Sequence, residues 1–425
     1  MGAVAERGPA TSRSARTAKV AIIYPWSDPS EMSKGNDLRT GLMAKVLAEC
    51  SAEVRLLSVG STCRNFDGVR GYCYSPKPGL RTWNRIVSLP FRAWLYVRTL
   101  GRSRGATFHL QMFYRFAFDP CFAARLRELV SWSDIVFVEY TFFAARVTRM
   151  AKWLGKKVVV TDHDVMADNV SNAKAGRYAH ALVVKKETAA MKAADLAVSV
   201  SEDERLRFQE LGVATICIPH GIDTRRVSVH PALGKEAWRS RLYESNGVRI
   251  AAEQVCLFVG SGIVPNKEAA AILERLSQNL EGSDIVVVLA GDCMPKARRG
   301  KLLALGRIDD GALDALYRLA DLVVIPLLQG TGASLKTIEA MAYAKPILGT
   351  RVAFRGYPVV PGRDCLIDDD TSKYSSLIAS ALTDTQALAA MGERARRLAE
   401  QFDYRVTYSE YVRRTEKLLA AETTP

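Results

Sequence analysis

The sequence lacks the features that mark several other classes of protein. No apolar run approaches the roughly 18–20 residues that span a bilayer, and residues 1–18 contain no apolar core of the kind that a secretory signal has. The eight cysteines form no Cys-x-x-Cys pair and show no metal-type spacing with histidine, which argues against structural zinc. No Gly-x-Gly-x-x-Gly motif follows either predicted first strand, which disfavours an NAD-dependent oxidoreductase. We therefore expect a reduced, cytoplasmic protein.

Acidic residues are scarce in the first half of the chain. Residues 1–222 carry 32 Lys and Arg against 20 Asp and Glu, and residues 77–127 carry ten basic residues against one acidic residue, Asp119. Aromatic side chains are interleaved with these cations. Three interpretations of 77–127 stay open: a solvated basic face, a nucleic-acid surface, or a patch that docks on an anionic membrane. The absence of helix-turn-helix, zinc-finger and RNP signatures disfavours nucleic acid as a partner.

The rest of the chain alternates short β-branched runs with amphipathic patterns, and 425 residues exceed one ordinary core. The strand-like runs are apolar almost throughout, as expected when helices cover both faces of a parallel sheet. These runs form two series, 20–24, 54–59, 134–140, 156–162 and 196–201, then 255–260, 284–291, 322–326 and 346–350. Helical patterns occupy 36–50, 141–155, 174–194, 265–280, 309–320 and 334–344. This alternation predicts an α/β fold of two doubly wound, Rossmann-like domains, with ligands in the cleft at the carboxyl ends of their strands.

The polar stretch 224–254 has no strand pattern, and we place the connection between the domains there. The predicted organisation is a disordered N-terminus, two domains, and a long C-terminal helix with a tail. The corresponding ranges are 1–18, 19–222, 223–401 and 402–425. The C-terminal helix starts after the second domain is complete, so we expect it to pack back across the hinge.

One segment, GTGASLKTIEAMAYAKP (330–346), joins a glycine-rich loop to a strong helical pattern. Gly330 and Gly332 permit backbone conformations closed to other residues and let a ligand approach the main chain. The N–H groups at the start of such a helix form an anion site, although a helix cap by Ser334 would explain the loop without a ligand. Glu339 lies one turn inside the helix, near its apolar stripe, where an unpaired carboxylate is costly. A phosphate at the helix start and a ribose on Glu339 would suit one nucleoside diphosphate.

This segment resembles the glutamate-x7-glutamate motif of retaining glycosyltransferases of family 4 (glycosyl transferases group 1), which have the GT-B fold. The resemblance covers most of 19–420. It is quite specific in FVGSGIVPNKEAA (258–270) and GRIDDGALDALYRLADLVVIPL (306–327), and it extends to 193–223, 33–49 and 137–165. It implies a first domain that binds the acceptor, a second domain that binds a nucleotide sugar, and a C-terminal helix that crosses back between them.

The sequence departs from the family pattern in three places. Thr331 replaces the first glutamate of the pair, which contacts the sugar hydroxyls in the family. Ser261 follows Gly260 where arginine is common, and Lys267 is the only cation nearby. The hinge Asn-Gly appears as His220-Gly221, where His220 is expected to shape the hinge. We interpret these changes as the mark of a subfamily.

The resemblance and the expected cleft assign roles to single residues. Cations and N–H donors aimed at the departing diphosphate are the main requirement of the chemistry. The candidate catalytic residues are His163, Lys267, Lys336 and Glu339. The candidate substrate-binding residues are Gly35, Arg39, Arg307, Thr331, Gly332, Ala333, Ser334, Leu335 and Glu339.

The assignments differ in what they ask of each side chain. Gly35 would let the first loop close over the phosphates, Arg39 would face the acceptor, and Arg307 would border the base. His163 ends a strand near the position of the family's histidine that faces the donor sugar. The alternative for His163 is a structural bond to Asp162 or Asp164, and the alternative for both lysines is a solvated surface position. No metal or other cofactor is required.

The resulting hypothesis is a retaining glycosyltransferase of the hexosyl type. It would move a sugar from a nucleoside-diphosphate sugar to a hydroxyl of a glycan, lipid-linked or small-molecule acceptor at the cytosolic membrane face, in cell-envelope polysaccharide or glycoconjugate synthesis. Two alternatives share the fold: a non-catalytic binding protein, suggested by Thr331, and a nucleotide-sugar epimerase, which needs acid and base carboxylates in the cleft.

Overall fold

The structure is a computed structural model that describes most of the chain. The described residues are 17–26, 28–31, 35–50, 52–60, 62–80, 82–83, 86, 89–90, 93, 97, 112, 116, 119–163, 177–227 and 234–421. The predicted disordered start lies outside them apart from its last two residues, as does much of the basic segment 77–127.

The first half of the chain builds a parallel seven-stranded sheet. Its strand order is β3-β2-β1-β4-β5-β6-β7. The strands are β1 (Ala18–Ile23), β2 (Ala52–Val59), β3 (Val69–Tyr74), β4 (Ile135–Glu139), β5 (Lys157–Thr161), β6 (Leu196–Ser199) and β7 (Ile216–Cys217). Alternate side chains of β1 enter two separate apolar clusters, one on each face, because helices cover both faces of the sheet.

The second half repeats this plan. Its sheet has the order β10-β11-β9-β8-β12-β13-β14 and is parallel except for the β10–β11 pair. The strands are β8 (Gln254–Val259), β9 (Ile285–Ala290), β10 (Ala297–Arg299), β11 (Leu302–Ala304), β12 (Leu322–Ile325), β13 (Ile347–Gly349) and β14 (Leu366–Ile367). One large apolar cluster surrounds this sheet.

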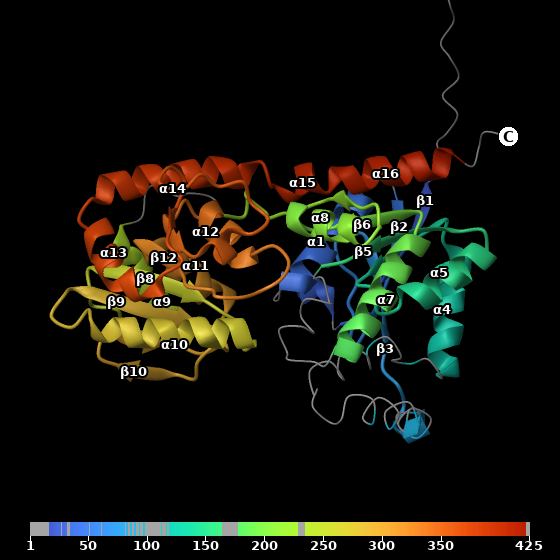
Figure 1. The fold of residues 1–425 in the computed structure, drawn as a ribbon, viewed down its shortest axis with the longest axis horizontal. Helices are drawn as coiled ribbons and strands as arrows, with labels where there is room; N and C mark the ends of the chain where they lie inside the picture. The colour runs from blue at the N-terminus through green and yellow to red at the C-terminus, as the bar shows by residue number, and fades with distance from the viewer. Residues whose placement is uncertain are drawn as a thin grey trace, which may run out of the picture.

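The two sheets lie side by side, each with its own helices, and the last helices of the chain, over residues 385–420, run along one side of both (Figure 1). In the first domain the helices are α1 (Gly35–Glu49), α4 (Pro120–Trp132), α5 (Ala144–Trp153), α7 (Arg177–Ala193) and α8 (Glu202–Glu210). In the second they are α9 (Lys235–Asn246), α10 (Val264–Gln278), α11 (Asp310–Leu319), α12 (Leu335–Ala342), α13 (Tyr374–Ala381) and α14 (Thr385–Glu400). The C-terminal helices are α15 (Tyr404–Thr407) and α16 (Ser409–Ala420).

The predicted fold class is confirmed, and one local prediction needs correction. The stretch 224–254, in which we placed the connection between the domains, also contains the helix α9, which was not predicted and which buries Trp238 and Leu242 in the second domain. Only two apolar side chains mark that buried face, which left the helical pattern too weak to detect. The predicted single helix at 402–422 is interrupted between α15 and α16, where Tyr408 separates the two. The exact domain limits stay a prediction.

The chain crosses between the domains twice, and the two crossings touch. Ile222 donates its N–H to the Phe402 carbonyl (3.0 Å) and accepts from the N–H of Tyr404 (3.0 Å). A Cβ on Gly221 would lie 2.6 Å from the Tyr404 Cα, so only glycine fits this close approach.

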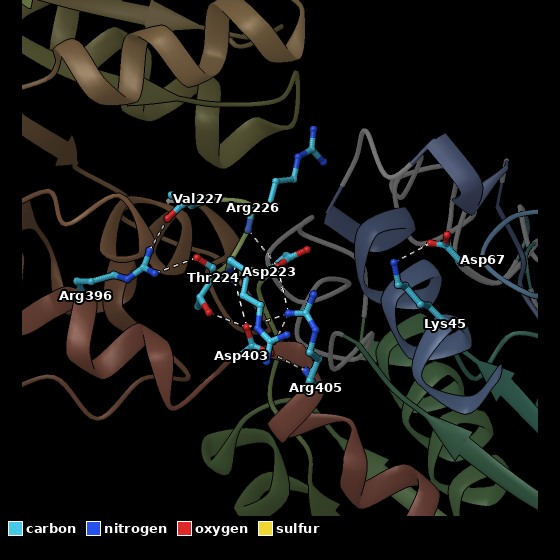
Figure 2. Close-up of polar contacts among 10 residues, drawn as sticks. Lys45, Asp67, Asp223, Thr224, Arg226, Val227, Arg396, Asp403 and Arg405 are labelled. Carbon is cyan, nitrogen blue, oxygen red and sulfur yellow. Dashed lines mark hydrogen bonds and ion pairs between the residues drawn. The ribbon is translucent and has the colours of Figure 1, made fainter. Parts of the chain in front are cut away.

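Charged side chains surround this double crossing (Figure 2). The Asp403 carboxylate accepts from the Thr224 hydroxyl (2.6 Å), and Arg405 contacts both Asp403 and Asp223. From α14, Arg396 donates to the carbonyls of Thr224 (2.9 Å) and Val227 (2.8 Å). The interdomain connection is therefore an ordered, hydrogen-bonded element.

Candidate functional site

The site lies where the second sheet reverses its strand order. β8 is flanked by β9 on one side and β12 on the other, and open α/β sheets bind ligands at the carboxyl ends of the strands where the order reverses in this way. The loop after β8 leads into α10, and the loop after β12 leads into α12. The Lys336 ammonium on α12 donates to Asn266 Oδ1 on α10 (2.7 Å), and the Asn266 amide donates to the carbonyl (3.1 Å) and hydroxyl (3.0 Å) oxygens of Ser261. Asn266 thus ties the two loops together.

The glycine loop after β12 has the backbone shape that its glycines predict. Gly330 has a φ of +155° and Gly332 a φ of +68°, the latter in the left-handed region. A side chain absent from the sequence-based hypothesis holds this loop. The Arg355 guanidinium donates to the carbonyl oxygens of Gly330, of Thr331 (2.8 Å) and of Gly332 (3.2 Å).

The start of α12 corrects part of the predicted anion site. Ser334 occupies the N-cap position, but its side chain makes no capping hydrogen bond. Its hydroxyl accepts from the hydroxyl of Thr337 (2.8 Å), and its amide donates to the carbonyl of Arg355 (3.3 Å). The Ser334 amide is therefore already engaged. Ala333 and Leu335 flank it at the loop and the first helical position.

Glu339 lies one turn into α12 and is partly buried. Its carboxylate accepts a hydrogen bond from the hydroxyl of Tyr317 on α11 (3.1 Å). The Tyr317 ring stacks on Tyr343, with centroids 4.6 Å apart. Burial raises the pKa of Glu339, while the Tyr317 hydrogen bond and the Lys336 charge act in the opposite direction. One side of the carboxylate is thus fixed by the protein.

Lys336 places an ammonium group in this site. Burial lowers its pKa to about 8, and the nearby Glu339 carboxylate only partly offsets that effect. Its ammonium also lies 5.5 Å from the centroid of the Phe258 ring. An anion bound beside this ammonium would raise its pKa again toward the ordinary value.

The structure brings neither Lys267 nor Arg307 into these contacts. Lys267 is exposed in the first turns of α10, and Arg307 is exposed after β11. No ion pair joins either side chain to another described residue. Their predicted roles in binding the leaving diphosphate and the base stay predictions.

His163 lies at the carboxyl end of β5 in the first domain and is buried. Its Nε2 lies 2.6 Å from Glu139 Oε2, and because an ionised carboxylate only accepts, Nε2 carries the proton. The expected carboxylate partners were Asp162 or Asp164; the one found is Glu139 at the end of β4, and Asp164 lies outside the described residues. Among the described residues, Nδ1 of His163 has no hydrogen-bond partner. Burial lowers the pKa of His163 despite the Glu139 charge, which favours the neutral ring.

Arg39 does not face an acceptor surface, which corrects its predicted role. Its side chain is fully buried. The guanidinium donates to the Ile218 carbonyl (3.3 Å), to His220 Nδ1 (3.2 Å) and to the Tyr411 hydroxyl of α16 (2.7 Å). Arg39 therefore joins α1 to the hinge and to the C-terminal helix. Gly35 is the first residue of α1, and the loop residues just before it lie outside the described residues.

Within the described parts of the chain, no group of three or more His, Cys, Asp and Glu side chains is placed to hold a metal ion. No helix among the described residues is both long enough and apolar enough to cross a bilayer.

Sequence reasoning missed four residues that hydrogen-bond to the candidate site residues or to the glycine loop: Tyr317, Arg355, Asn266 and Glu139. Glu139 carried a signal, since it is the one carboxylate in the apolar run IVFVE. Asn266 lies inside the quoted segment 258–270 without having been singled out. Tyr317 and Arg355 reach the site from other elements, and nothing in their local sequence indicates it.

Comparison with known proteins assigns these domains. Residues 253–384 match the family model described as "Glycosyl transferases group 1", and residues 43–226 match "Glycosyltransferase Family 4". No curated protein matches the chain significantly.

Solved structures share the whole fold at low sequence identity. HepE from Anabaena in complex with UDP has a TM-score of 0.65 and 15% identity, over 94% of this chain and 100% of that one. Sucrose-phosphate synthase from Thermosynechococcus elongatus has a TM-score of 0.64 and 16% identity, over 95% and 100%. The E. coli structure "Trehalose-6-phosphate … bound with UDP-2-fluoro glucose" has a TM-score of 0.62 and 12% identity, over 93% and 98%. With a family model matched in each domain and this fold around them, the chain belongs to the group 1 glycosyltransferases of GT-B fold.

Proposed function

We propose that this glycosyltransferase transfers a sugar from a nucleoside-diphosphate sugar to a hydroxyl group with retention of anomeric configuration. The acceptor is a glycan, lipid-linked or small-molecule hydroxyl, in cell-envelope polysaccharide or glycoconjugate synthesis. One arrangement supports this function most strongly. The glycine loop leads into α12, and Lys336 and Glu339 lie in the first turns of that helix, at the point where the second sheet reverses its strand order.

Each part of a nucleoside diphosphate has a group to receive it there. The loop amides and the Lys336 ammonium suit the two phosphates, because both are positive where the ligand is negative. Glu339 keeps one carboxylate side bonded to Tyr317 and offers its remaining lone pairs to the ribose hydroxyls. In this proposal Thr331 and Gly332 contact the sugar attached to the second phosphate.

These groups also suit the chemistry of sugar transfer. Negative charge grows on the leaving diphosphate as its bond to the anomeric carbon breaks, and a preorganised cation and N–H donors stabilise that charge. Lys336 and, on ligand binding, Lys267 serve this role in the proposal. The donor phosphate itself takes the proton of the attacking hydroxyl on the same face of the sugar. His163 receives a hydroxyl of the donor sugar through the Nδ1 lone pair.

Three solved structures of one structural relative support the choice of donor. HepE has been solved in complex with UDP, with UDP and glucose, and with UDP-glucose. At 14–15% identity such likeness carries the fold alone, and the base and sugar of this protein are for experiment to identify.

We further propose that the first domain docks on an anionic membrane from the cytoplasmic side through the basic segment 77–127. Trp83, Ile86, Leu89 and Val97 are exposed apolar side chains within this cation-rich segment. An anionic lipid surface attracts basic side chains, and neighbouring apolar side chains can insert into it. Co-sedimentation with phosphatidylglycerol vesicles, but not with phosphatidylcholine vesicles, is the expected result; equal or absent binding to both contradicts it.

The transferase proposal is tested with the purified full-length chain. Its melting temperature is measured against UDP, GDP, ADP and TDP and their sugars, followed by slow hydrolysis of whichever donor stabilises it. One diphosphate should raise the melting temperature, since a ligand that binds only the folded state stabilises it by mass action. The corresponding nucleotide sugar should then be consumed, and NMR should show that the released sugar has kept its anomeric configuration.

The other outcomes separate the rivals. Binding without consumption, also in the presence of acceptor extracts, favours the non-catalytic binding protein. Conversion of one nucleotide sugar into its epimer favours the epimerase. If no nucleotide changes the melting temperature, the glycine loop is only a helix start and the proposal is wrong.

A further inference from the structure

The Arg355 side chain makes an unusually large number of contacts with the glycine loop, because it donates hydrogen bonds to three of its backbone carbonyls. Three successive carbonyl oxygens, those of Gly330, Thr331 and Gly332, accept hydrogen bonds from one guanidinium. Arginine alone among side chains has a rigid, planar fork of five donors that can serve such a set. The contact is therefore specific to this residue type.

The bonded carbonyls decide where the loop amides point. In a planar trans peptide the C=O of one residue and the N–H of the next point in opposite directions. Because the carbonyls of Thr331 and Gly332 face Arg355, the N–H groups of Gly332 and Ala333 face away from it. Successive N–H groups on one side of a turn form an anion-binding concavity.

This backbone arrangement needs support. Three carbonyl dipoles aimed at one point repel one another, and a cation at that point removes the repulsion. The next residues add a second restraint, because the Arg355 carbonyl accepts from the amide of Ser334 (3.3 Å). Gly356 has a φ of +87°, and a Cβ there would lie 2.5 Å from the Cβ of Ala333, so the segment packs tightly along the loop.

We propose that Arg355 is a positioning residue that holds the amides of Gly332 and Ala333 toward the diphosphate of the donor. It acts from the side of the loop opposite the ligand, so it touches the backbone and not the substrate. The inference rests on the proposed function, since it needs a diphosphate at this loop. Preorganised donors of this kind are effective because they need no rearrangement when charge develops.

The test compares Arg355→Ala and Arg355→Lys with the matched control Arg351→Ala. Arg351 is exposed in the same segment and pairs only at the surface with Asp369 (3.0 Å), so its loss removes the same charge without touching the loop. Titration calorimetry measures the affinity of each variant for UDP and GDP, and for uridine and guanosine, which lack the phosphates. Donor hydrolysis supplies kcat and KM.

Arg355→Ala is expected to weaken diphosphate binding about tenfold to a hundredfold, by analogy with losing hydrogen bonds to a charged group. Nucleoside affinity should change less than twofold, and methylguanidinium in the buffer should restore part of the loss. Arg355→Lys should recover only part, since an ammonium cannot reach three carbonyls in a plane. Arg351→Ala should bind as the wild type does.

Two results would overturn the inference: unchanged diphosphate affinity in Arg355→Ala, or an equal loss for diphosphate and nucleoside. Where Arg355→Ala does not fold, the same comparison is made with Arg355→Lys. A wild-type protein that binds no nucleoside diphosphate contradicts the proposed function itself, whereas a binding wild type with an indifferent Arg355 variant contradicts this inference alone.

Discussion

The buried ammonium of Lys336 makes diphosphate binding depend on pH in a calculable way. Its pKa is about 8, mainly because burial disfavours the charged form. A bound diphosphate brings negative charge to the ammonium and returns that pKa toward the ordinary value near 10.5. The bound state therefore holds its proton more tightly, and binding above pH 8 takes up a proton.

The sign and size of the effect follow from linkage. Below pH 8 both states are protonated and Lys336 contributes no pH dependence. Between about pH 8 and the higher pKa of the bound state, affinity falls by up to tenfold per pH unit. The full return to 10.5 corresponds to roughly 3 kcal/mol, which is an upper limit because the side chain is partly exposed and screened.

Calorimetry of UDP and GDP binding between pH 7 and 9.5, in two buffers of different ionisation enthalpy, measures both affinity and proton uptake. Lys336→Met should weaken binding and remove the pH dependence above pH 8. Lys345→Met is the matched control, because burial also lowers the pKa of Lys345 to about 8, but its ammonium donates to the Arg318 carbonyl past the far end of α12. A pH profile that is flat in the wild type, or one that Lys345→Met abolishes instead, would refute the reasoning.

Three other expectations concern single contacts. Glu339→Gln should weaken nucleoside diphosphate binding by about 10- to 100-fold in calorimetry, since hydrogen bonds to a charged group contribute roughly 1.5–3 kcal/mol, and an unchanged affinity would remove Glu339 from the site. Glu139→Ala should lower the free energy of unfolding, measured by urea denaturation, by about 1–3 kcal/mol, because the buried Nε2–H of His163 loses its acceptor. A loss below about 0.5 kcal/mol, roughly the smallest net contribution of one hydrogen bond, would contradict this expectation. Gly221→Ala should cost roughly 1–3 kcal/mol by the same assay, since its Cβ would lie 2.6 Å from the Tyr404 backbone; a wild-type unfolding midpoint would show that the crossing can yield.

Much of the fold was predictable because its determinants are local. Apolar runs of β-branched residues form buried strands wherever both faces of a sheet are covered, and the predicted run 284–291 became β9 (Ile285–Ala290) with every residue buried. Helix α9 escaped detection because its burial depends on the surface offered by α11, which no local pattern of α9 records.

The two glycines and Glu339 were also predictable, since a positive φ and a costly buried carboxylate each restrict the residue type on their own. The sequence by itself therefore determined a two-domain α/β protein, the glycine loop with its helix, and the carboxylate one turn inside that helix. Only the tertiary structure decided which partners those groups receive. It placed Arg355 under three loop carbonyls, and it turned Arg39 inward to Tyr411 instead of toward an acceptor. The physical reason is that a hydrogen bond between distant segments depends on where two folded elements pack, and neither segment carries that information alone.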